Sequence, residues 1–273
     1  MEPSHTNAPP PELRIIPTTA AQAHEEHDSQ RSLPLVERLR DAEVIINPPI
    51  VAPMDQSQYV ILDGANRCYS FRELGYPHLL VQVAAYESGY VELDTWSHII
   101  SGWDIHLLLE AFNKLDDMRL QDGQDRDAIA HLILPEGRVI AVTGPVQSTH
   151  ERNAALRHLV SIYQKNATLY RTAINEPAEI WPLYPDAIAL MIFPRYVPAD
   201  IIAATRYKAY LPPGISRHVI HGRALRVNYP LAPLRDRNTS LDEKNAQLSR
   251  WMQRKLAQRS VRYYAEATYQ FDE

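Results

Sequence analysis

Residues 59–75, which read YVILDGANRCYSFRELG, place an apolar run directly before a charged turn and a helical pattern. The first four residues are β-branched, aromatic or bulky, which is typical of a short buried strand. The Asp63-Gly64 turn follows, and its glycine can approach a ligand closely. If residues 65–74 form a helix, its first N–H groups point back at this turn, with Arg67 one turn in. The stretch predicts a phosphate site, unless Asp63 merely caps the helix beside a solvated Arg67.

Composition describes an ordinary globular chain. The 273 residues are 45% hydrophobic and 22% charged, with a formal net charge of −5. A chain of this length can bury a substantial core as one large domain or two lobes. The mildly acidic balance argues against a dedicated nucleic-acid binder, although a local basic face stays open.

Cysteine usage and hydropathy limit which covalent cross-links, metal clusters and cellular locations the sequence allows. Cys68 is the single cysteine, so neither an internal disulfide nor a cysteine-based zinc cluster can form. No apolar stretch approaches the length of a bilayer span, and the N-terminus lacks a charged-then-apolar signal pattern. We expect a cytoplasmic protein without a membrane partner.

The hydrophobic periodicity predicts an α+β chain. Residues 1–12 are polar and proline-rich, and we expect a disordered lead-in there. Strands are expected within 13–17, 44–52, 59–62 and 79–83, with helices at 33–42 and 65–75. Farther along, we expect helices at 105–119, 148–165, 199–209 and 241–259, a hairpin of 128–134 with 139–143, and a strand at 187–193. The inner side of the helix at 148–165 is expected to carry Leu156, Leu159, Val160 and Tyr163. The basic residues of the last helix, Lys244 among them, are interpreted as a solvated face, with a nucleic-acid contact as the alternative.

Residues 24–28, which read HEEHD, allow two interpretations. As structure, they are an exposed acidic start to the following helix. As chemistry, they supply a carboxylate that accepts a proton in an active site. His24 and His27 are spaced to face the same way, but without an evident third ligand they do not predict a metal site.

Residues 211–231 form the second informative stretch, because two prolines and a glycine predict a rigid loop. Ser216, Arg217 and His218 are expected to project from that loop together and to suit an anionic ligand, since arginine grips a carboxylate or phosphate with two parallel hydrogen bonds. Surface salt bridges are the alternative. Trp96 is interpreted either as a packing residue or as a wall of a substrate pocket.

These stretches together resemble a known family. The residues at 24–26, the NPPIV run at 47–51, the turn at 63–67 and the segment 86–100 are similar to the ParB/sulfiredoxin superfamily, and within it to the free L-serine kinases of the SerK and SbnI type. The resemblance implies a ParB/sulfiredoxin-like nucleotide-binding domain at 22–104. A lead-in and short strand at 1–21 would precede it. A second α+β lobe at 105–235 would carry the substrate loop, and a C-terminal helix and tail would occupy 236–273.

The resemblance also implies a reaction: phosphorylation of the hydroxyl of free L-serine to O-phospho-L-serine with ATP, or ADP, and Mg²⁺. It makes Glu25 the general base, with Glu26 as the fallback, and gives Asp63 the task of holding Mg²⁺ or the reacting groups. The other implied contacts are Gly64, Ala65, Asn66 and Arg67 for the nucleotide phosphates, and Trp96, Ser216, Arg217 and His218 for the serine. The O-phospho-L-serine product would feed siderophore or cysteine biosynthesis.

Departures from the family pattern leave alternatives open. Archaeal members carry DGHHR where this chain has Asp-Gly-Ala-Asn-Arg, which leaves the choice between ATP and ADP open, and a serine-contacting Ser of the family falls near Arg38. The alternative function is a ParB-like, nucleotide-gated, DNA-binding regulator. A sulfiredoxin-like reductase is disfavoured because Cys68 follows Arg67 instead of preceding it, so an ordinary buried thiol is expected. Oligomeric state and any haem-binding role are not fixed by the sequence.

Overall fold

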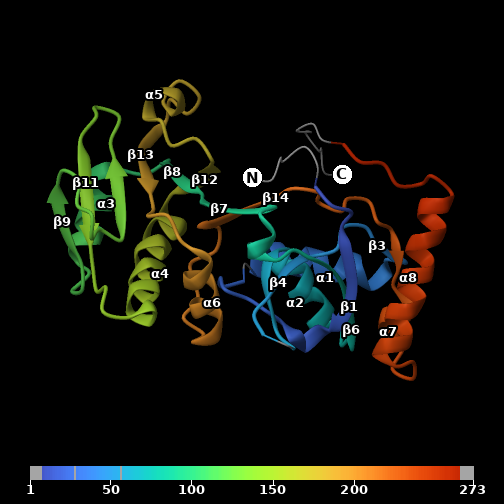
Figure 1. The fold of residues 1–273 in the computed structure, drawn as a ribbon. Helices are drawn as coiled ribbons and strands as arrows, with labels where there is room; N and C mark the ends of the chain where they lie inside the picture. Colours follow the sequence, from blue (N-terminus) through green and yellow to red (C-terminus); the bar gives the residue numbers. More distant parts are fainter. Residues whose placement is uncertain (1–7, 28, 56, 265–273) are drawn as a thin grey trace. The chain divides into compact units, whose positions relative to one another are not determined.

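The computed structural model describes residues 8–27, 29–55 and 57–264. The chain divides into two compact units. The first unit comprises Met1–Ala23, His27–Glu92 and His218–Glu273, and the second comprises His24–Glu26 and Leu93–Arg217. Both contain helices and strands, so the predicted α+β class is confirmed (Figure 1). The expected domain ranges stay a prediction. The disordered lead-in expected at 1–12 is wrong at Glu12, which begins β1, and its residues 1–7 lie outside the described residues.

The first unit is built on a five-stranded sheet in the order β1-β6-β4-β5-β2. The strands are β1 (Glu12–Pro17), β2 (Ala21–Gln22), β4 (Ile50–Pro53), β5 (Tyr59–Asp63) and β6 (His78–Val83). The β2–β5 and β4–β6 pairs are parallel, whereas β1–β6 and β4–β5 are antiparallel. The first four residues of β5 are all buried, as expected of a strand covered on both faces, and this holds Asp63 at the end of a rigid element.

Over its described residues the first unit contains the helices α1 (Ser29–Asp41), α2 (Ala65–Glu73), α7 (Ala232–Arg235) and α8 (Leu241–Ala257). It also contains the 3₁₀ turns η2 (Thr18–Ala20) and η3 (Tyr86–Ser88) and a small pair of β3 (Val44–Ile45) with β15 (Tyr229–Pro230). Helix α8 runs alongside β1, and Asn245 exchanges hydrogen bonds with both backbone groups of Ile15 (Figure 1). The last helix is therefore part of this unit's core.

The interpretation of α8 as a wholly solvated basic face is wrong at Lys244, which is only 1% exposed. Its ammonium donates to the carbonyl oxygen of Asp236 and lies 3.0 Å from Nδ1 of His78. A buried lysine is tolerated where its donors have such acceptors.

The second unit contains a six-stranded antiparallel sheet in the order β12-β8-β13-β10-β11-β9. Its strands are β8 (Ser97–Ser101), β9 (Arg119–Asp122), β10 (Ala130–Ile133), β11 (Val139–Thr143), β12 (Thr168–Thr172) and β13 (Ala187–Ile192). Its helices are α3 (Ile105–Asn113), α4 (Thr149–Asn166), α5 (Pro177–Ile180) and α6 (Pro198–Arg206). The predicted hairpin and the predicted inner face of α4 are confirmed.

Two predicted elements differ from the structure. The helix expected at 105–119 ends at Asn113, because its last turn tightens into bonds from Leu115 to Phe112 and from Met118 to Leu115, and β9 starts at Arg119. Residues expected in a loop instead form β14 (Ser216–Ile220), which pairs with β7 (Val91–Thr95). The division between the units falls within both of these strands.

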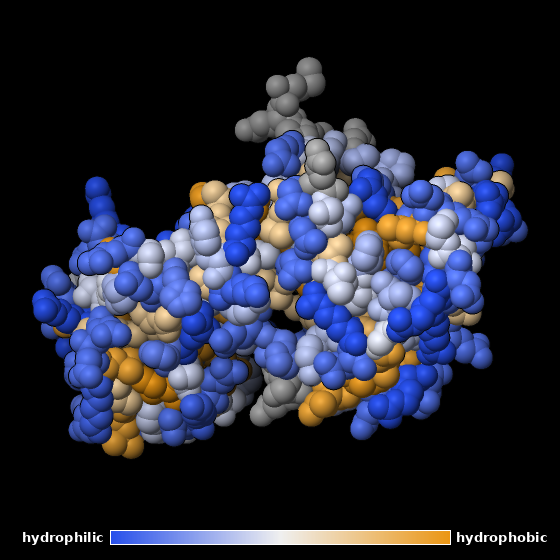
Figure 2. Space-filling model, turned by 90° about the horizontal axis from the view of Figure 1, so that it is seen from below, coloured by the Kyte–Doolittle hydropathy of each residue, from blue (hydrophilic) through white to orange (hydrophobic). Residues whose placement is uncertain are grey.

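Hydropathy varies over the molecular surface. On the face seen in Figure 2 hydrophilic residues predominate, and the apolar ones form separate small groups, as is ordinary for exposed surface. Within the described ranges, no helix combines the length and the apolar character that crossing a membrane would need.

Candidate active site

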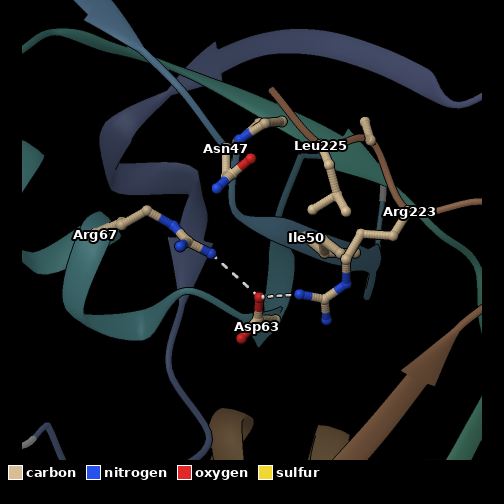
Figure 3. A pocket seen from close by; sticks show the side chains of 8 residues that line it. Asn47, Ile50, Asp63, Arg67, Arg223 and Leu225 are labelled. Carbon is tan, nitrogen blue, oxygen red and sulfur yellow. Dashed lines mark hydrogen bonds and ion pairs between the residues drawn. The ribbon is translucent and has the colours of Figure 1, made fainter. Parts of the chain in front are cut away.

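An anion pocket lies in the first unit, at the end of β5. Its volume is about 250 Å³. It is lined by Asn47, Pro48, Ile50, Asp63, Arg67, Arg223, Ala224 and Leu225. Figure 3 shows Arg67 and Arg223 reaching Asp63 from two sides, and Oδ2 of Asp63 lies 3.1 Å from Arg67 Nη2 and 2.9 Å from Arg223 Nη1.

The charges in this pocket favour an anion. Burial would raise the pKa of the Asp63 carboxyl, but the guanidiniums of Arg67 and Arg223 outweigh burial and hold that pKa below its ordinary value. Two permanent cations then face one carboxylate, which leaves a net positive charge. Arg67 Nε is buried and has no hydrogen-bond partner among the described residues.

The start of α2 adds backbone donors to the same pocket. Gly64, and not Asp63, is the N-cap of the helix, so Asp63 does not have the N-cap role that was the alternative. Ala65 and Asn66 are the first residues of α2. Gly64 has φ +88°, and a Cβ there would lie 2.8 Å from Arg67 Nη2 and 3.1 Å from Cα of Pro49, so only glycine fits.

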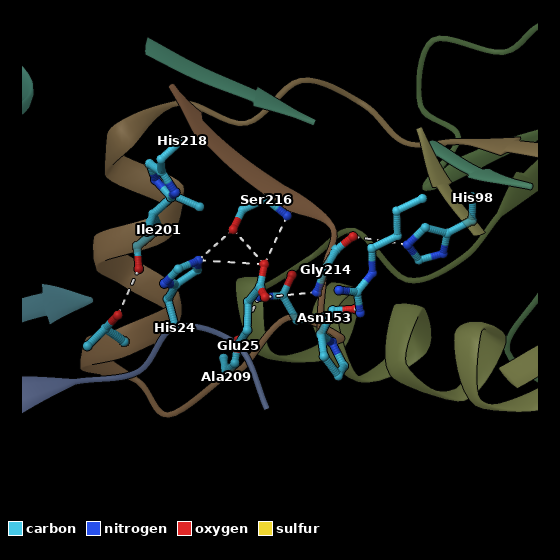
Figure 4. A network of polar contacts seen from close by, with 12 residues as sticks. His24, Glu25, His98, Asn153, Ile201, Ala209, Gly214, Ser216 and His218 are labelled. Atoms are coloured by element: carbon cyan, nitrogen blue, oxygen red, sulfur yellow. Dashed lines mark hydrogen bonds and ion pairs between the residues drawn. The ribbon is translucent and has the colours of Figure 1, made fainter. Parts of the chain in front are cut away.

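The second unit holds a carboxylate cluster around Glu25 (Figure 4). Oε1 of Glu25 accepts from the backbone N–H of Ser216 at 2.9 Å and from its hydroxyl at 2.5 Å. Oε2 accepts from the backbone N–H of Gly214 at 2.8 Å. The ionised carboxylate is the form that accepts all three bonds, which fix its position.

His24 completes the Glu25 cluster. Its Nε2 lies 2.6 Å from Oγ of Ser216 and 3.7 Å from Oε1 of Glu25. Because the Ser216 hydroxyl gives its one hydrogen to Glu25, His24 Nε2 is the donor to Ser216. Glu26, the fallback base, is exposed and pairs with Arg157 at 3.1 Å instead.

A second polar group in this unit joins Arg217, Trp96 and Asp94. The guanidinium carbon of Arg217 lies 5.0 Å from the ring centroid of Trp96, and its Nη1 lies 3.1 Å from Oδ2 of Asp94. The indole face and the carboxylate hold the guanidinium in place while its other donors stay available to a ligand.

The expectation that Ser216, Arg217 and His218 all project together is wrong at Arg217, because in a strand Arg217 points to the face opposite that of Ser216 and His218. Ser216 contacts Glu25, and Arg217 contacts Trp96. His218 belongs to the first unit, where its Nε2 lies 2.8 Å from the hydroxyl of Tyr86.

The structure thus groups the predicted site residues in two places. Glu25, Trp96, Ser216 and Arg217 lie in the second unit, and the 63–67 turn and His218 lie in the first. Sequence reasoning missed Gly214, Asp94 and Arg223 as functional candidates. Only Gly214 had a signal, since a glycine after two prolines marks a backbone with special geometry. Arg223 meets Asp63 from 160 residues away, and no local pattern announces that contact.

The described residues offer neither a reactive thiol nor a cluster of metal ligands. Cys68 is 1% exposed, and burial raises the pKa of its thiol to about 12, so the predicted inert thiol is confirmed. Among the residues that the structure describes, no group of three His, Cys, Asp or Glu could hold a metal ion. Asp63 as a ligand of Mg²⁺ stays a prediction, and its Oδ2 already accepts from two guanidiniums.

Comparison with known sequences gives two informative relatives, whereas no family model matches. An ATP-dependent L-serine kinase of Staphylothermus marinus is 32% identical over 107 residues, which are 39% of this chain and 42% of the relative. The match thus spans less than half of that kinase. The ATP-dependent L-serine kinase SbnI of Staphylococcus aureus is 22% identical over 262 residues, 94% of this chain and 96% of the relative.

Solved structures extend the likeness to the fold. SbnI with a C-terminal truncation, from Staphylococcus aureus, superposes with a TM-score of 0.72 at 19% identity and covers 90% of this chain and 96% of its own. A free serine kinase in complex with AMP gives 0.68 at 16% identity, covering 83% and 95%. The chain is therefore similar in sequence to two ATP-dependent L-serine kinases and shares the fold of the free serine kinases.

Proposed function

We propose that this chain is an ATP-dependent L-serine kinase, which moves the γ-phosphoryl group of ATP to the hydroxyl of free L-serine and releases ADP and O-phospho-L-serine. The observation that carries the proposal is the Glu25 carboxylate, ionised and fixed by three donors, in the same unit as an arginine held against a tryptophan. That combination supplies a base for a hydroxyl and a cation for an amino-acid carboxylate.

The anion pocket suits the nucleotide phosphates. Phosphoryl transfer asks the protein mainly for positioning and charge neutralisation, and Arg67 and Arg223 with the N-terminus of α2 can provide both. Asp63 holds the two guanidiniums apart and in place. ATP is preferred to ADP as the donor because both curated relatives are named ATP-dependent. Magnesium would arrive with the nucleotide as the MgATP substrate, and no step is assigned to Asp63 through it.

Serine would bind in the second unit. Oε2 of Glu25 accepts one bond within the described residues, from Gly214, and keeps a lone pair for the substrate hydroxyl. As the serine oxygen attacks the γ-phosphorus, its proton passes to Glu25. Arg217 would grip the serine carboxylate with Trp96 as a wall, which makes the attack effectively intramolecular. His218 as a serine ligand stays a prediction.

The remaining expectations are carried as part of this proposal. The first unit would be the ParB/sulfiredoxin-like, nucleotide-binding part of the enzyme. Siderophore and cysteine biosynthesis stay predictions for the pathway that consumes the product, and the cytoplasm stays the predicted location. The alternative of a ParB-like DNA-binding regulator is not favoured, because the chain has a formal net charge of −5 and both curated relatives are named serine kinases.

One assay tests the proposal. The purified chain is incubated with L-serine, Mg²⁺ and either ATP or ADP, and O-phosphoserine is measured by mass spectrometry, with D-serine as the matched substrate control. We expect product with L-serine and ATP. A folded chain that makes no O-phosphoserine from either nucleotide overturns the proposal, and product from ADP alone overturns the choice of donor.

A further inference from the structure

Behind the Glu25 cluster, the second unit buries two titratable side chains that the proposed reaction does not use. His98 on β8 and Tyr163 on α4 are both 0% exposed. Nε2 of His98 lies 3.0 Å from the carbonyl oxygen of Gly214, and its Nδ1 lies 2.8 Å from the hydroxyl of Tyr163. The same Gly214 donates its N–H to Glu25 (Figure 4).

The chemistry of the partner groups fixes which atom donates in each hydrogen bond between Gly214, His98 and Tyr163. A carbonyl oxygen only accepts, so His98 Nε2 carries the hydrogen. Burial lowers the pKa of His98 to about 4, so the ring is neutral near pH 7 and its Nδ1 must accept. Burial also raises the pKa of Tyr163 well above its ordinary value, so its hydroxyl keeps the proton and donates it to Nδ1.

The peptide groups around Gly214 explain what these bonds can do. Glu25 is held by the N–H of Gly214 and the N–H of Ser216, which belong to the peptide groups before Gly214 and before Ser216. The carbonyl that His98 binds belongs to the peptide group between those two. His98 therefore fixes the middle of a three-peptide segment whose outer members hold the proposed base.

The three-peptide segment would be flexible at Gly214 without further contacts. Gly214 has φ +79°, in the left-handed region where glycine is free to move. On its other side, Arg171 donates to the carbonyl oxygen of Pro213 at 3.1 Å, and its guanidinium occupies the space that a Cβ of residue 214 would need. His98 and Arg171 thus constrain a flexible residue between them.

We propose that His98 and Tyr163 are positioning residues for the kinase reaction: Tyr163, together with the Gly214 carbonyl, favours the Nε2–H form of His98, which fixes the peptide segment that orients Glu25. The inference rests on the proposed function only in assigning the base role to Glu25. A simple packing role is the competing explanation, since the His98 ring also makes edge contacts with Phe193 and Tyr163, at centroid distances of 5.0 and 5.9 Å. The two explanations predict different behaviour for a phenylalanine at position 98.

The kinetic test compares His98→Phe, His98→Gln and Tyr163→Phe with the unchanged chain. Phenylalanine keeps the ring contacts and removes the donor, and we expect kcat to fall about 100-fold with both KM values within about twofold. Glutamine offers an amide N–H to the Gly214 carbonyl and should bring kcat back to within about fivefold of the unchanged chain. Tyr163→Phe should cost about tenfold. Tyr76→Phe removes a buried, partnered hydroxyl from the first unit and should leave kcat within about twofold.

Nitrogen-15 NMR of the imidazole supplies a readout that does not depend on turnover. We expect the Nε2–H form of His98 in the unchanged chain and a measurable minor share of the Nδ1–H form in Tyr163→Phe, where the Gly214 carbonyl alone favours Nε2–H. An Nδ1–H form in the unchanged chain, or a His98→Phe variant with full kcat, overturns the inference. If the unchanged chain forms no O-phosphoserine, the proposed function fails while the spectra still test the network. If His98→Phe does not fold, Tyr163→Phe and the spectra decide.

Discussion

Oε2 of Glu25 lies 2.8 Å from the backbone nitrogen of Gly214, a residue 189 positions later in the chain. The contact links a side chain from the N-terminal part of the sequence to a backbone group that no other residue type could present. The orientation of Glu25, the proposed base, therefore depends on the backbone conformation of Gly214.

Gly214→Ala should therefore inactivate the enzyme. An added Cβ would overlap the guanidinium of Arg171, and the positive φ is unfavourable for alanine. The backbone must shift, and the N–H then leaves Glu25, so we expect kcat to fall by at least about 100-fold. Steady-state kinetics and urea unfolding measure the two consequences.

Gly137→Ala is the matched control, because Gly137 also has a positive φ, +87°, but nothing lies within 4 Å of the position that an added methyl group would take. Both variants should lose about 1 kcal/mol of unfolding free energy from the backbone conformation, and only Gly214→Ala should lose turnover. Equal activity in the two variants would contradict the importance of this contact.

Glu25→Gln should abolish turnover while nucleotide binding persists. Glutamine cannot take the serine proton, and its amide presents hydrogens where the carboxylate accepted bonds from Gly214 or Ser216. The expected loss in kcat is about 10² to 10⁴-fold, with the Kd for ATP within about twofold by calorimetry.

Glu26→Gln tests whether Glu26, and not its neighbour Glu25, is the general base. Glu26 pairs with Arg157 and is exposed, so kcat should stay within about threefold. A large loss in Glu26→Gln and none in Glu25→Gln would transfer the base role to Glu26.

The sequence predicted elements whose cause is local. The strand, turn and helix of residues 59–75 follow from a bulky apolar run, an Asp-Gly turn and helical spacing, all within one short stretch. The four buried positions expected on the inner side of α4 were likewise predictable, because helical periodicity alone sets which residues face the core.

Contacts between distant segments were not predictable in the same way. The strand at 216–220 depends on pairing with β7, which no local signal at 216 announces, and the proline-glycine turn before it favoured a loop. Lys244 looks like one more exposed cation in a basic helix, and only the folded chain supplies the Asp236 carbonyl and His78 that accept its hydrogens.

Arg223→Gln should weaken nucleotide binding. The substitution removes one of two cations from the anion pocket and leaves Asp63 paired with Arg67 alone. We expect KM for ATP to rise about 10- to 100-fold with KM for serine little changed, since a charge-assisted hydrogen bond contributes about 1.5–3 kcal/mol. Arg250→Gln removes the same charge from an exposed position of α8 and should change neither constant. An equal rise of the KM for ATP in both variants would mean that ATP binding depends on the net charge of the protein and not on the anion pocket.

Arg217→Ala should raise the KM for serine more than it lowers kcat. The guanidinium would contact the substrate carboxylate in the ground state and in the transition state alike, which is the signature of uniform binding. A loss of about 2 kcal/mol corresponds to about a 30-fold rise in KM. Arg195→Ala, at an exposed position of the second unit, is the control. A fall in kcat with KM unchanged would instead place Arg217 at the reacting phosphoryl group.

Protonation of His98 should make folding pH-dependent. Its pKa is about 4 in the folded chain, lowered by burial, against 6.5 for an ordinary histidine. The unfolded chain therefore binds more protons between these values, so the stability is fully present above about pH 6.5 and is lost as the pH falls toward 4. Between about pH 7 and pH 5 the loss is on the order of 2 kcal/mol. His98→Gln should remove this part of the pH dependence of the urea-unfolding free energy, whereas His106→Gln, at an exposed position of α3, should leave it in place. An unchanged slope in His98→Gln would show that the buried ring does not stay neutral in the folded protein.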